Sequence, residues 1–187
     1  EKVRQLNIES SLDSTNSALR RLAIEDQHAA VIVAEHQSGG RGRRGRQWHS
    51  PYARNIYLSI GWKLENSLSE LGCLSLVAAL ATASALSRAG LNGHTVKWPN
   101  DLVLDGRKLC GCLVEVQGDS QGPCHAVLGV GINVHMPASA LTEVGNHYKE
   151  FGLNEKANYK YAEALDVCEE ILVQAKKVGG KLLEQTY

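Results

Sequence analysis

Residues 95–116 read TVKWPNDLVLDGRKLCGCLVEV. At their centre, Asp105-Gly106 separates two apolar runs, which is the strongest short sequence signal for a β-hairpin. The hairpin places Lys108 early on its second strand, near the turn and across from Asn100-Asp101. Pro99 has no backbone N–H to donate, so the chain before Asn100 should bend instead of pairing continuously. A bent Trp-Pro-Asn-Asp segment beside a lysine on a rigid strand is more typical of a site than of plain sheet.

Apolar runs on either side of this hairpin predict further strands. Residues 30–34 are rich in β-branched side chains, and residues 55–62 alternate as a half-buried strand does. A weaker alternation over residues 3–8 predicts a first strand. Residues 126–134 form another apolar run, which contains Asn133. A buried asparagine needs hydrogen-bond partners, and either a ligand or a turn at the end of the sheet would provide them.

Two stretches predict the main helices. Residues 71–89 are rich in alanine and leucine and nearly free of charge, which predicts a helix buried on most sides and ended by Gly90. Residues 161–177 also carry apolar side chains at helical spacing. Ser14 is a suitable N-cap for a shorter helix near the start of the chain. The order of elements predicts an α+β fold, in which a mixed β-sheet has helices packed mainly on one face.

Four glycines and four arginines form a loop at residues 39–46, after the strand over residues 30–34. Glycine lets the backbone approach a ligand closely, and arginine suits carboxylate and phosphate groups. We therefore expect a loop that is mobile when empty and ordered by an anion. A solvated basic loop and a segment that binds nucleic acid non-specifically are the alternatives from the loop alone. Trp48, just after the loop, is either a core aromatic or the wall of a binding slot.

Composition limits the class of protein. The 187 residues suffice for one domain, and 20 basic residues balance 20 acidic ones, so a globally basic nucleic-acid binder is not indicated. Five cysteines without framework spacing are typical of reduced thiols in a cytoplasmic protein. Cys110 and Cys112 do not match a zinc or redox motif and are interpreted as core residues. Neither a secretory signal nor a membrane-spanning apolar run is recognisable.

Four blocks in this order resemble the catalytic domain of the biotin protein ligase family, the biotin–[acetyl-CoA-carboxylase] ligases. The blocks are residues 14–16, Gln37 with residues 40–48, residues 97–115 and residues 129–134. Each block is weak alone, but the glycine-arginine loop followed by KWPND and GRKLxG is highly specific. The resemblance implies a fold like that of class II aminoacyl-tRNA synthetases and a single catalytic domain over residues 1–187. The N-terminal DNA-binding domain and the small C-terminal β-barrel domain of many members are not expected, nor is transcriptional control.

The resemblance implies a two-step reaction. Biotin and ATP, with Mg²⁺ as cofactor, give biotinyl-5′-AMP and pyrophosphate, and a lysine of a biotin carrier domain of a carboxylase then takes the biotinyl group. The implied partner is that carrier domain, with no nucleic acid and no membrane, and the oligomer it suggests is a homodimer.

The resemblance also implies roles for individual residues. Lys108 and Arg43 are the expected catalytic residues, and Lys108 should contact both the biotin carboxylate and the α-phosphate. Asp101 is the expected magnesium ligand. Biotin contacts are expected from Ser14, Thr15, Asn16, Gln37, Gly40, Arg41, Lys108 and Gly111. Nucleotide contacts are expected from Arg43, Arg44, Arg46, Trp48, Asn100, Asp101 and Asn133.

Two other functions remain open on the sequence. A lipoyl protein ligase shares the fold and the adenylation chemistry, but the arginine-glycine loop and the KWPND block favour biotin. A nucleic-acid-binding module would use Arg41, Arg43, Arg44 and Arg46, and zero net charge argues against it.

Overall fold

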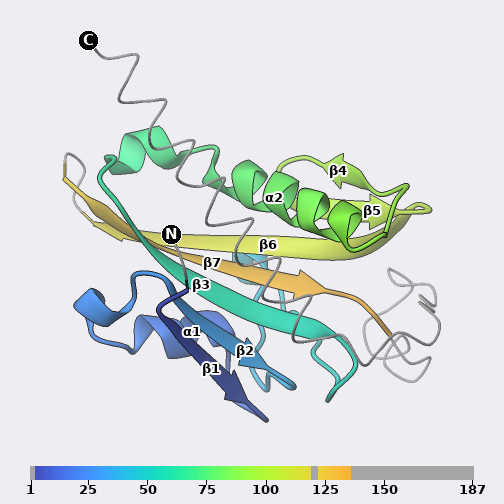
Figure 1. Cartoon of the computed structure of the whole chain (residues 1–187), viewed down its shortest axis with the longest axis horizontal. Helices are drawn as coiled ribbons and strands as arrows, with labels where there is room; N and C mark the ends of the chain where they lie inside the picture. Colours follow the sequence, from blue (N-terminus) through green and yellow to red (C-terminus); the bar gives the residue numbers. More distant parts are fainter. Residues whose placement is uncertain (1–2, 119–121, 136–187) are drawn as a thin grey trace.

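A computed structural model of the chain describes residues 3–118 and 122–135 (Figure 1). Within them, seven strands form one sheet in the order β1-β2-β3-β7-β6-β5-β4. The strands are β1 Gln5–Glu9, β2 Ala30–Ala34, β3 Ile56–Leu64, β4 Thr95–Lys97, β5 Asp101–Leu104, β6 Arg107–Gly118 and β7 Cys124–Ile132. The helix predicted over residues 161–177 lies outside the described residues.

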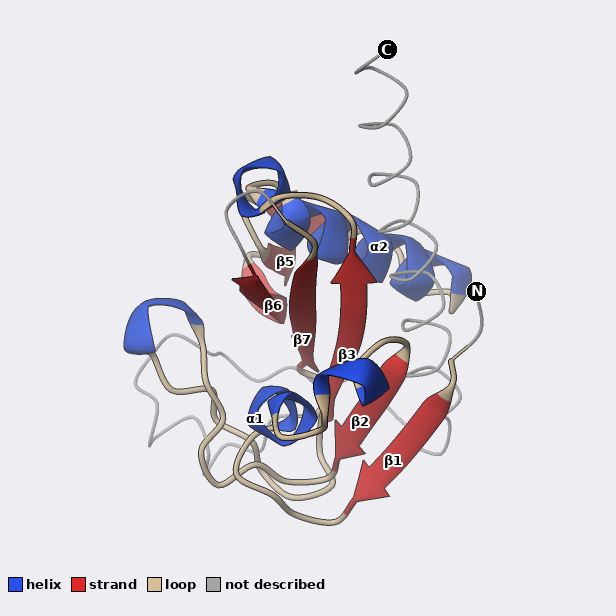
Figure 2. Ribbon diagram, turned by 90° about the vertical axis from the view of Figure 1, so that its left-hand side faces the viewer, coloured by secondary structure: helices blue, strands red, loops and turns tan. Residues whose placement is uncertain are grey.

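The sheet is mixed, as predicted. β1 and β2 are parallel, whereas the other neighbouring strands pair antiparallel. This confirms the α+β fold class. We predicted helices mainly on one face, and Figure 2 shows the two described α-helices, α1 (Thr15–Arg20) and α2 (Leu74–Arg88), on opposite sides of the sheet. The longer helix, α2, covers the large apolar core, and the short α1 packs against β2, β3 and β7.

Alternation along the strands explains the two faces. On β7, Leu128 and Val130 belong to the core under α2, while Val127 packs with Leu19 of α1. Successive side chains of a strand point to opposite faces, so the remaining odd-numbered positions of β7 also face α1. Those positions are His125, Gly129 and Gly131, and the two glycines leave room for the site described below.

The predicted hairpin between β5 and β6 is confirmed. Asp105 and Gly106 have φ of 50° and 73°, and a two-residue type I′ turn requires positive φ at both central positions. The predicted bend is confirmed as well, because β4 ends at Lys97 and β5 begins at Asp101, with a cis Trp98–Pro99 peptide bond in the turn.

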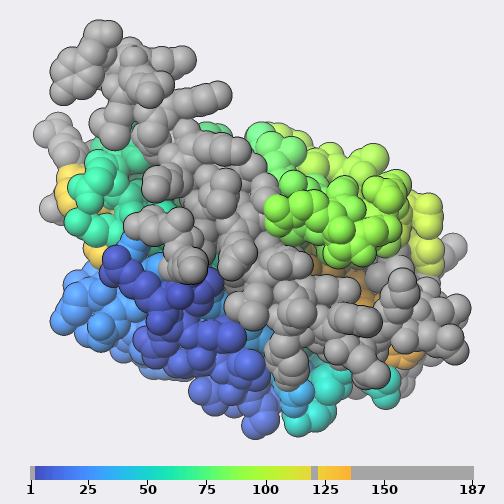
Figure 3. All heavy atoms as spheres, in the orientation of Figure 1, coloured from blue at the N-terminus to red at the C-terminus, as the bar shows by residue number. Residues whose placement is uncertain are grey.

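Helix α2 is shorter than predicted, and a 3-10 turn, Leu68–Leu71, precedes it. Its end is confirmed, because Gly90 has φ of 91° and the Leu91 N–H reaches the Leu86 carbonyl at 2.9 Å. The predicted burial on most sides does not hold for Leu80, which is 50% exposed. Figure 3 shows the α2 segment at the outer surface of the molecule. None of the helices within the described residues is long and apolar enough to cross a membrane.

Candidate functional site

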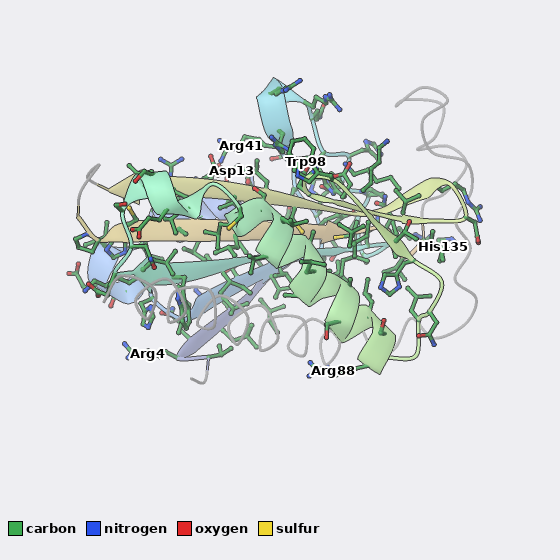
Figure 4. The ribbon with its side chains drawn as sticks, turned by 90° about the horizontal axis from the view of Figure 1, so that it is seen from above. Arg4, Asp13, Arg41, Arg88, Trp98 and His135 are labelled. Carbon is green, nitrogen blue, oxygen red and sulfur yellow. The ribbon has the colours of Figure 1, made fainter. Side chains whose placement is uncertain are left out.

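A cavity of about 580 Å³ opens on the α1 face of the sheet. Its walls come from the N-terminus of α1, the glycine-arginine loop, the β4–β5 turn and the middle of β6 and β7. Figure 4 shows the loop that carries Arg41 and the turn that carries Trp98 near one another above the sheet. The lining residues are 14–16, 37, 41–44, 46–48, 97–101, 103, 106, 108, 111–113 and 129–131.

Glycines form the floor of this cavity. Gly111 of β6 and Gly131 of β7 are paired neighbours in the sheet, and the indole of Trp48 lies directly over them. A Cβ atom added to Gly131 would lie 2.5 Å from Trp48 Cε2, and one added to Gly111 would lie 2.8 Å from Cζ3. The floor therefore accepts a flat aromatic ring because it has no side chains there. Trp48 lines the cavity and so belongs to the wall of the slot, and its buried Nε1 finds no hydrogen-bond partner within the described part of the chain.

A network of hydroxyls and amides closes the end of the cavity beside α1. The Thr15 backbone N–H and hydroxyl both donate to Gln37 Oε1, at 2.9 and 3.1 Å. Gln37 Nε2 donates to Ser50 Oγ at 3.2 Å, so both ends of this amide have fixed roles. Buried Ser59 places its hydroxyl 2.8 Å from Thr15 Oγ1 and 2.5 Å from Asn16 Oδ1. Such a network presets the donors and acceptors that a small polar ligand meets.

Two supports hold the start of α1. Ser14 is the N-cap, as predicted, and its hydroxyl accepts from the Ser17 N–H. Asp13 accepts two hydrogen bonds of 2.8 Å from Arg21, and these hold the pKa of Asp13 well below its usual range. The helix end that contributes Thr15 and Asn16 is therefore fixed from both sides.

Lys108 and Asp101 form an ion pair on the cavity wall. Lys108 Nζ lies 2.8 Å from Asp101 Oδ2 and 5.2 Å from the centre of the Trp48 ring. Their side chains are only 27% and 23% exposed, so water screens this charge less than it screens a surface lysine. The hairpin register places Lys108 of β6 opposite Val103 of β5, two residues from Asp101, and the long lysine side chain spans that offset. The predicted arrangement of these two residues is present.

Only one of the two carboxylate oxygens of Asp101 takes part in the ion pair with Lys108. Its Oδ1 is buried and has no hydrogen-bond partner among the described residues. Within those residues no group of three or more His, Cys, Asp or Glu side chains suits a metal ion. A single free carboxylate oxygen suits a cation whose other oxygen ligands come from water and from a bound phosphate group, as those of Mg²⁺ commonly do.

The loop arginines are held to different degrees. Arg41 donates to Glu115 Oε2 at 3.0 Å and to Ser17 Oγ at 3.1 Å, and Arg43 donates to Asn100 Oδ1 at 3.0 Å. The backbone closes the loop through the bridge between Arg41 and Gln47. Among the described lining residues, six cationic side chains face one carboxylate, that of Asp101. The six are Arg41, Arg43, Arg44, Arg46, Lys97 and Lys108. The cavity is thus strongly cationic in a chain of zero net charge, which favours an anionic ligand.

Two predicted site residues do not line the cavity. Asn133 is 2% exposed and donates its side-chain amide to the Lys108 carbonyl at 3.0 Å, just beyond the end of β7. Its partner is thus a backbone carbonyl near the start of β6, and neither a ligand nor a turn residue, the two alternatives from the sequence. Gly40 packs against the loop backbone, where an added Cβ would lie 2.5 Å from the Trp48 carbonyl oxygen. Ligand contacts from these two residues stay predictions.

Sequence reasoning missed the residues that support the site. Glu115 of β6 accepts from Asn16 at 2.8 Å, from Arg20 at 3.3 Å and from Arg41 at 3.0 Å. It therefore ties the base of the loop to α1 across the sheet. Buried Ser59 is the second omission. A single serine in the apolar strand over residues 56–64 was the signal that would have identified it.

We predict that Glu115→Gln loosens the base of the loop. The amide still accepts from Asn16, but the charge opposite Arg41 is gone, which costs about 1 kcal/mol. Amide hydrogen exchange at residues 39–42 should become roughly fivefold faster, the equivalent of that free energy. Arg20→Ala is the matched control, because it removes the other arginine from the same carboxylate and should leave exchange in the loop unaltered. Equal effects of the two substitutions would contradict this role of Glu115.

Known proteins share much of this sequence. The sequence pattern of the biotin/lipoate A/B protein ligase family matches residues 9–133. The bifunctional ligase/repressor BirA of Escherichia coli is 44% identical over 125 residues, covering 67% of this chain and 39% of BirA. A biotin–[acetyl-CoA-carboxylase] ligase of Mycobacterium tuberculosis is 39% identical over 137 residues, covering 70% of this chain and 50% of the ligase. The chain thus spans half or less of these two relatives.

A solved structure has the same fold. The biotin protein ligase of Aquifex aeolicus in complex with biotin and ATP superposes with a TM-score of 0.72 at 26% identity. The match covers 95% of this chain and 73% of that one.

Proposed function

The chain belongs to the biotin/lipoate A/B protein ligase family, and on that premise we propose that it is the catalytic domain of an ATP-dependent biotin protein ligase. It forms biotinyl-5′-AMP and pyrophosphate from biotin and ATP, and then transfers biotin to a lysine of a biotin carrier domain. One observation carries the proposal most directly. A partly buried lysine on a glycine floor lies in the same cavity as a preset hydroxyl–amide network. One ligand with a polar ring and a carboxylate would contact both.

The hydroxyl–amide network suits the ureido ring of biotin. That ring has a carbonyl acceptor and N–H donors on one rim, and Ser14, Thr15 and Gln37 line the cavity with groups of both kinds. Asn16 orients this end from behind through Ser59 and Glu115. The Trp48 indole, which covers Gly111, offers an apolar surface to the rest of the ligand.

Lys108 supports the adenylation step. The biotin carboxylate attacks the α-phosphorus of ATP, a carbonyl–O–P bond forms, and the P–O bond to pyrophosphate breaks with its electron pair. Two anions must approach each other, so positioning and neutralisation of charge do most of the work. The Nζ of Lys108 is a compact cation that can lie between carboxylate and phosphate. Its electrostatic stabilisation of both groups becomes stronger when water leaves the site. Arg43 and Asn100, already hydrogen-bonded to each other, would hold the nucleotide from the rim.

Asp101 would hold Mg²⁺ through the oxygen that has no protein partner. An ion held there would supply positive charge opposite the leaving pyrophosphate. Asp101 Oδ2 meanwhile keeps Lys108 directed into the cavity.

In the transfer step, the amine of the acceptor lysine attacks the acyl carbon. An amide bond forms, AMP leaves with the electron pair of the C–O bond, and a proton is lost from the amine. Because the mixed anhydride is sensitive to water, the glycine-arginine loop must cover it, and Gly42 and Gly45 give the loop the freedom to do so. We place the protein in the cytoplasm, where its buried thiols would stay reduced. A hydrogen bond with Cys112 and burial raise the pKa of the Cys110 thiol, which favours a core role.

Calorimetry with biotin tests the proposed function. We expect saturable binding of biotin, no comparable binding of lipoate, and biotin-dependent release of pyrophosphate from ATP and Mg²⁺. Preference for lipoate would make the chain a lipoyl ligase. Salt-dependent binding of unrelated DNA, stronger than binding of biotin, would support the nucleic-acid-binding alternative.

A further inference from the structure

Trp98 is the most exposed large apolar side chain in the described part of the chain. It is 79% exposed, ahead of Tyr52 at 57%, and it lies in the β4–β5 turn at the rim of the cavity. Figure 4 places it beside the loop that carries Arg41. Because an exposed indole costs free energy in water, its position at the mouth of a site needs an explanation.

The turn that carries Trp98 is braced on both sides. Lys97 of β4 lies opposite Asp101 of β5 in the strand pairing that closes the turn. Asn100 donates its side-chain amide to the Cys112 carbonyl at 2.8 Å. The Cys112 N–H in turn donates to the Asn100 carbonyl at 2.9 Å. The indole is therefore presented on a rigid support, and a partner that covers it would lose little entropy in ordering the turn.

The cavity itself does not need Trp98 as its aromatic wall. Trp48 is already packed over Gly111 and Gly131, next to Lys108. Trp98 is 79% exposed, so a small ligand enclosed in the cavity would leave most of its indole in contact with water. A macromolecule that meets the rim would cover it, and tryptophan is among the residues that contribute most to such contacts.

Charge indicates the chemistry of that macromolecule. Six cationic side chains and one carboxylate line the described cavity. Once pyrophosphate has left, the single phosphate of the adenylate neutralises only a small part of this excess. The next partner at the mouth should therefore bring acidic groups.

We propose that Trp98 is the docking anchor for the acceptor protein of the transfer step. The partner is a protein domain that carries acidic side chains near its target lysine and an apolar patch that packs on the indole. This inference rests on the proposed function, because transfer requires an acceptor at the cavity mouth. It assigns Trp98 to the second half-reaction and to neither biotin nor nucleotide.

Separate half-reactions test the proposal. The protein is first loaded with biotin, ATP and Mg²⁺, and pyrophosphate release is recorded. The preformed adenylate is then offered either the isolated biotin carrier domain of an acetyl-CoA carboxylase or hydroxylamine, a nucleophile too small to reach the rim. The variants are Trp98→Ala and Trp98→Gln, with Tyr52→Ala as the control, because Tyr52 is an exposed aromatic that does not line the cavity.

Trp98→Ala and Trp98→Gln should raise the KM for the carrier domain about tenfold or more, as loss of an aromatic anchor does. Pyrophosphate release and the hydroxylamine rate should match those of the unsubstituted protein, and Tyr52→Ala should behave like it throughout. Salt should raise the carrier KM without changing the hydroxylamine rate. An unchanged carrier KM would overturn the proposal, and so would a raised KM for ATP, which would assign Trp98 to the nucleotide. Failure of the unsubstituted protein to release pyrophosphate would instead overturn the proposed function itself.

Discussion

Lys108→Ala should slow biotin-dependent pyrophosphate release by about 10²- to 10³-fold while biotin binding weakens far less. The Lys108 ammonium is only 27% exposed and lies 2.8 Å from a carboxylate that directs it into the cavity. Its charge acts where two anions converge, so its loss should destabilise mainly the transition state. The expected loss of rate is of the size seen when one preorganised electrostatic group is removed. Pyrophosphate release measured under saturating ATP, together with calorimetry for biotin, separates the two effects.

Lys63→Ala provides the control. Lys63 also lies on a strand and is also paired with a carboxylate, Glu65, at 2.9 Å, but it does not line the cavity. Its removal should leave the reaction unaltered. Near-normal turnover in Lys108→Ala would show that this lysine is a structural partner of Asp101 and no more.

Gly131→Ala should disrupt both stability and the use of ATP. The new Cβ would lie 2.5 to 2.8 Å from three atoms of the Trp48 indole, closer than real Cβ contacts allow, so the ring must move off the floor. Overpacking of this kind costs about 1–3 kcal/mol of folding free energy. If Trp48 flanks the adenine, as we propose, the KM for ATP should rise about tenfold or more. Denaturant melts and ATP titrations of pyrophosphate release would measure the two consequences.

Two further variants make the Gly131 result interpretable. Gly72→Ala adds the same methyl group where nothing lies within 4 Å and φ is −57°, so it should change neither quantity. Gly131→Ala combined with Trp48→Leu should recover stability, because the clash is gone, but it should not recover the affinity for ATP. Recovery of both would mean that the indole has no role in nucleotide binding.

Local chemistry explains why much of the fold was predictable. The β5–β6 turn follows from Asp105-Gly106 alone, because few other dipeptides tolerate two positive φ values. The bend at Pro99 and the end of α2 at Gly90 likewise depend on one residue each. The hairpin also places Lys108 opposite Val103, two residues from Asp101 on the neighbouring strand, so that its long side chain reaches the Asp101 carboxylate.

Contacts between distant segments explain what was missed. Asn16 and Glu115 are 99 residues apart in sequence, and nothing local to either residue indicates that they meet. The family resemblance assigned Asn133 to the nucleotide, and that contact stays a prediction. As a polar side chain in an apolar run, Asn133 also needs a partner within the protein. The structure supplies that partner from the Lys108 carbonyl, whose position depends on the register of β6 against β7.

The two faces of β7 have a consequence for how this sequence can change. Leu128, Val130 and Ile132 contact the core under α2, whereas the intervening Gly129 and Gly131 lie beneath Asn16 and Trp48. Two requirements thus alternate over residues 128–132 of one strand. A substitution at Leu128, Val130 or Ile132 should act mainly on the melting temperature, whereas one at Gly129 or Gly131 should act on the rate of the reaction as well. A one-residue insertion in β7 would exchange the two sets and fail both tests at once.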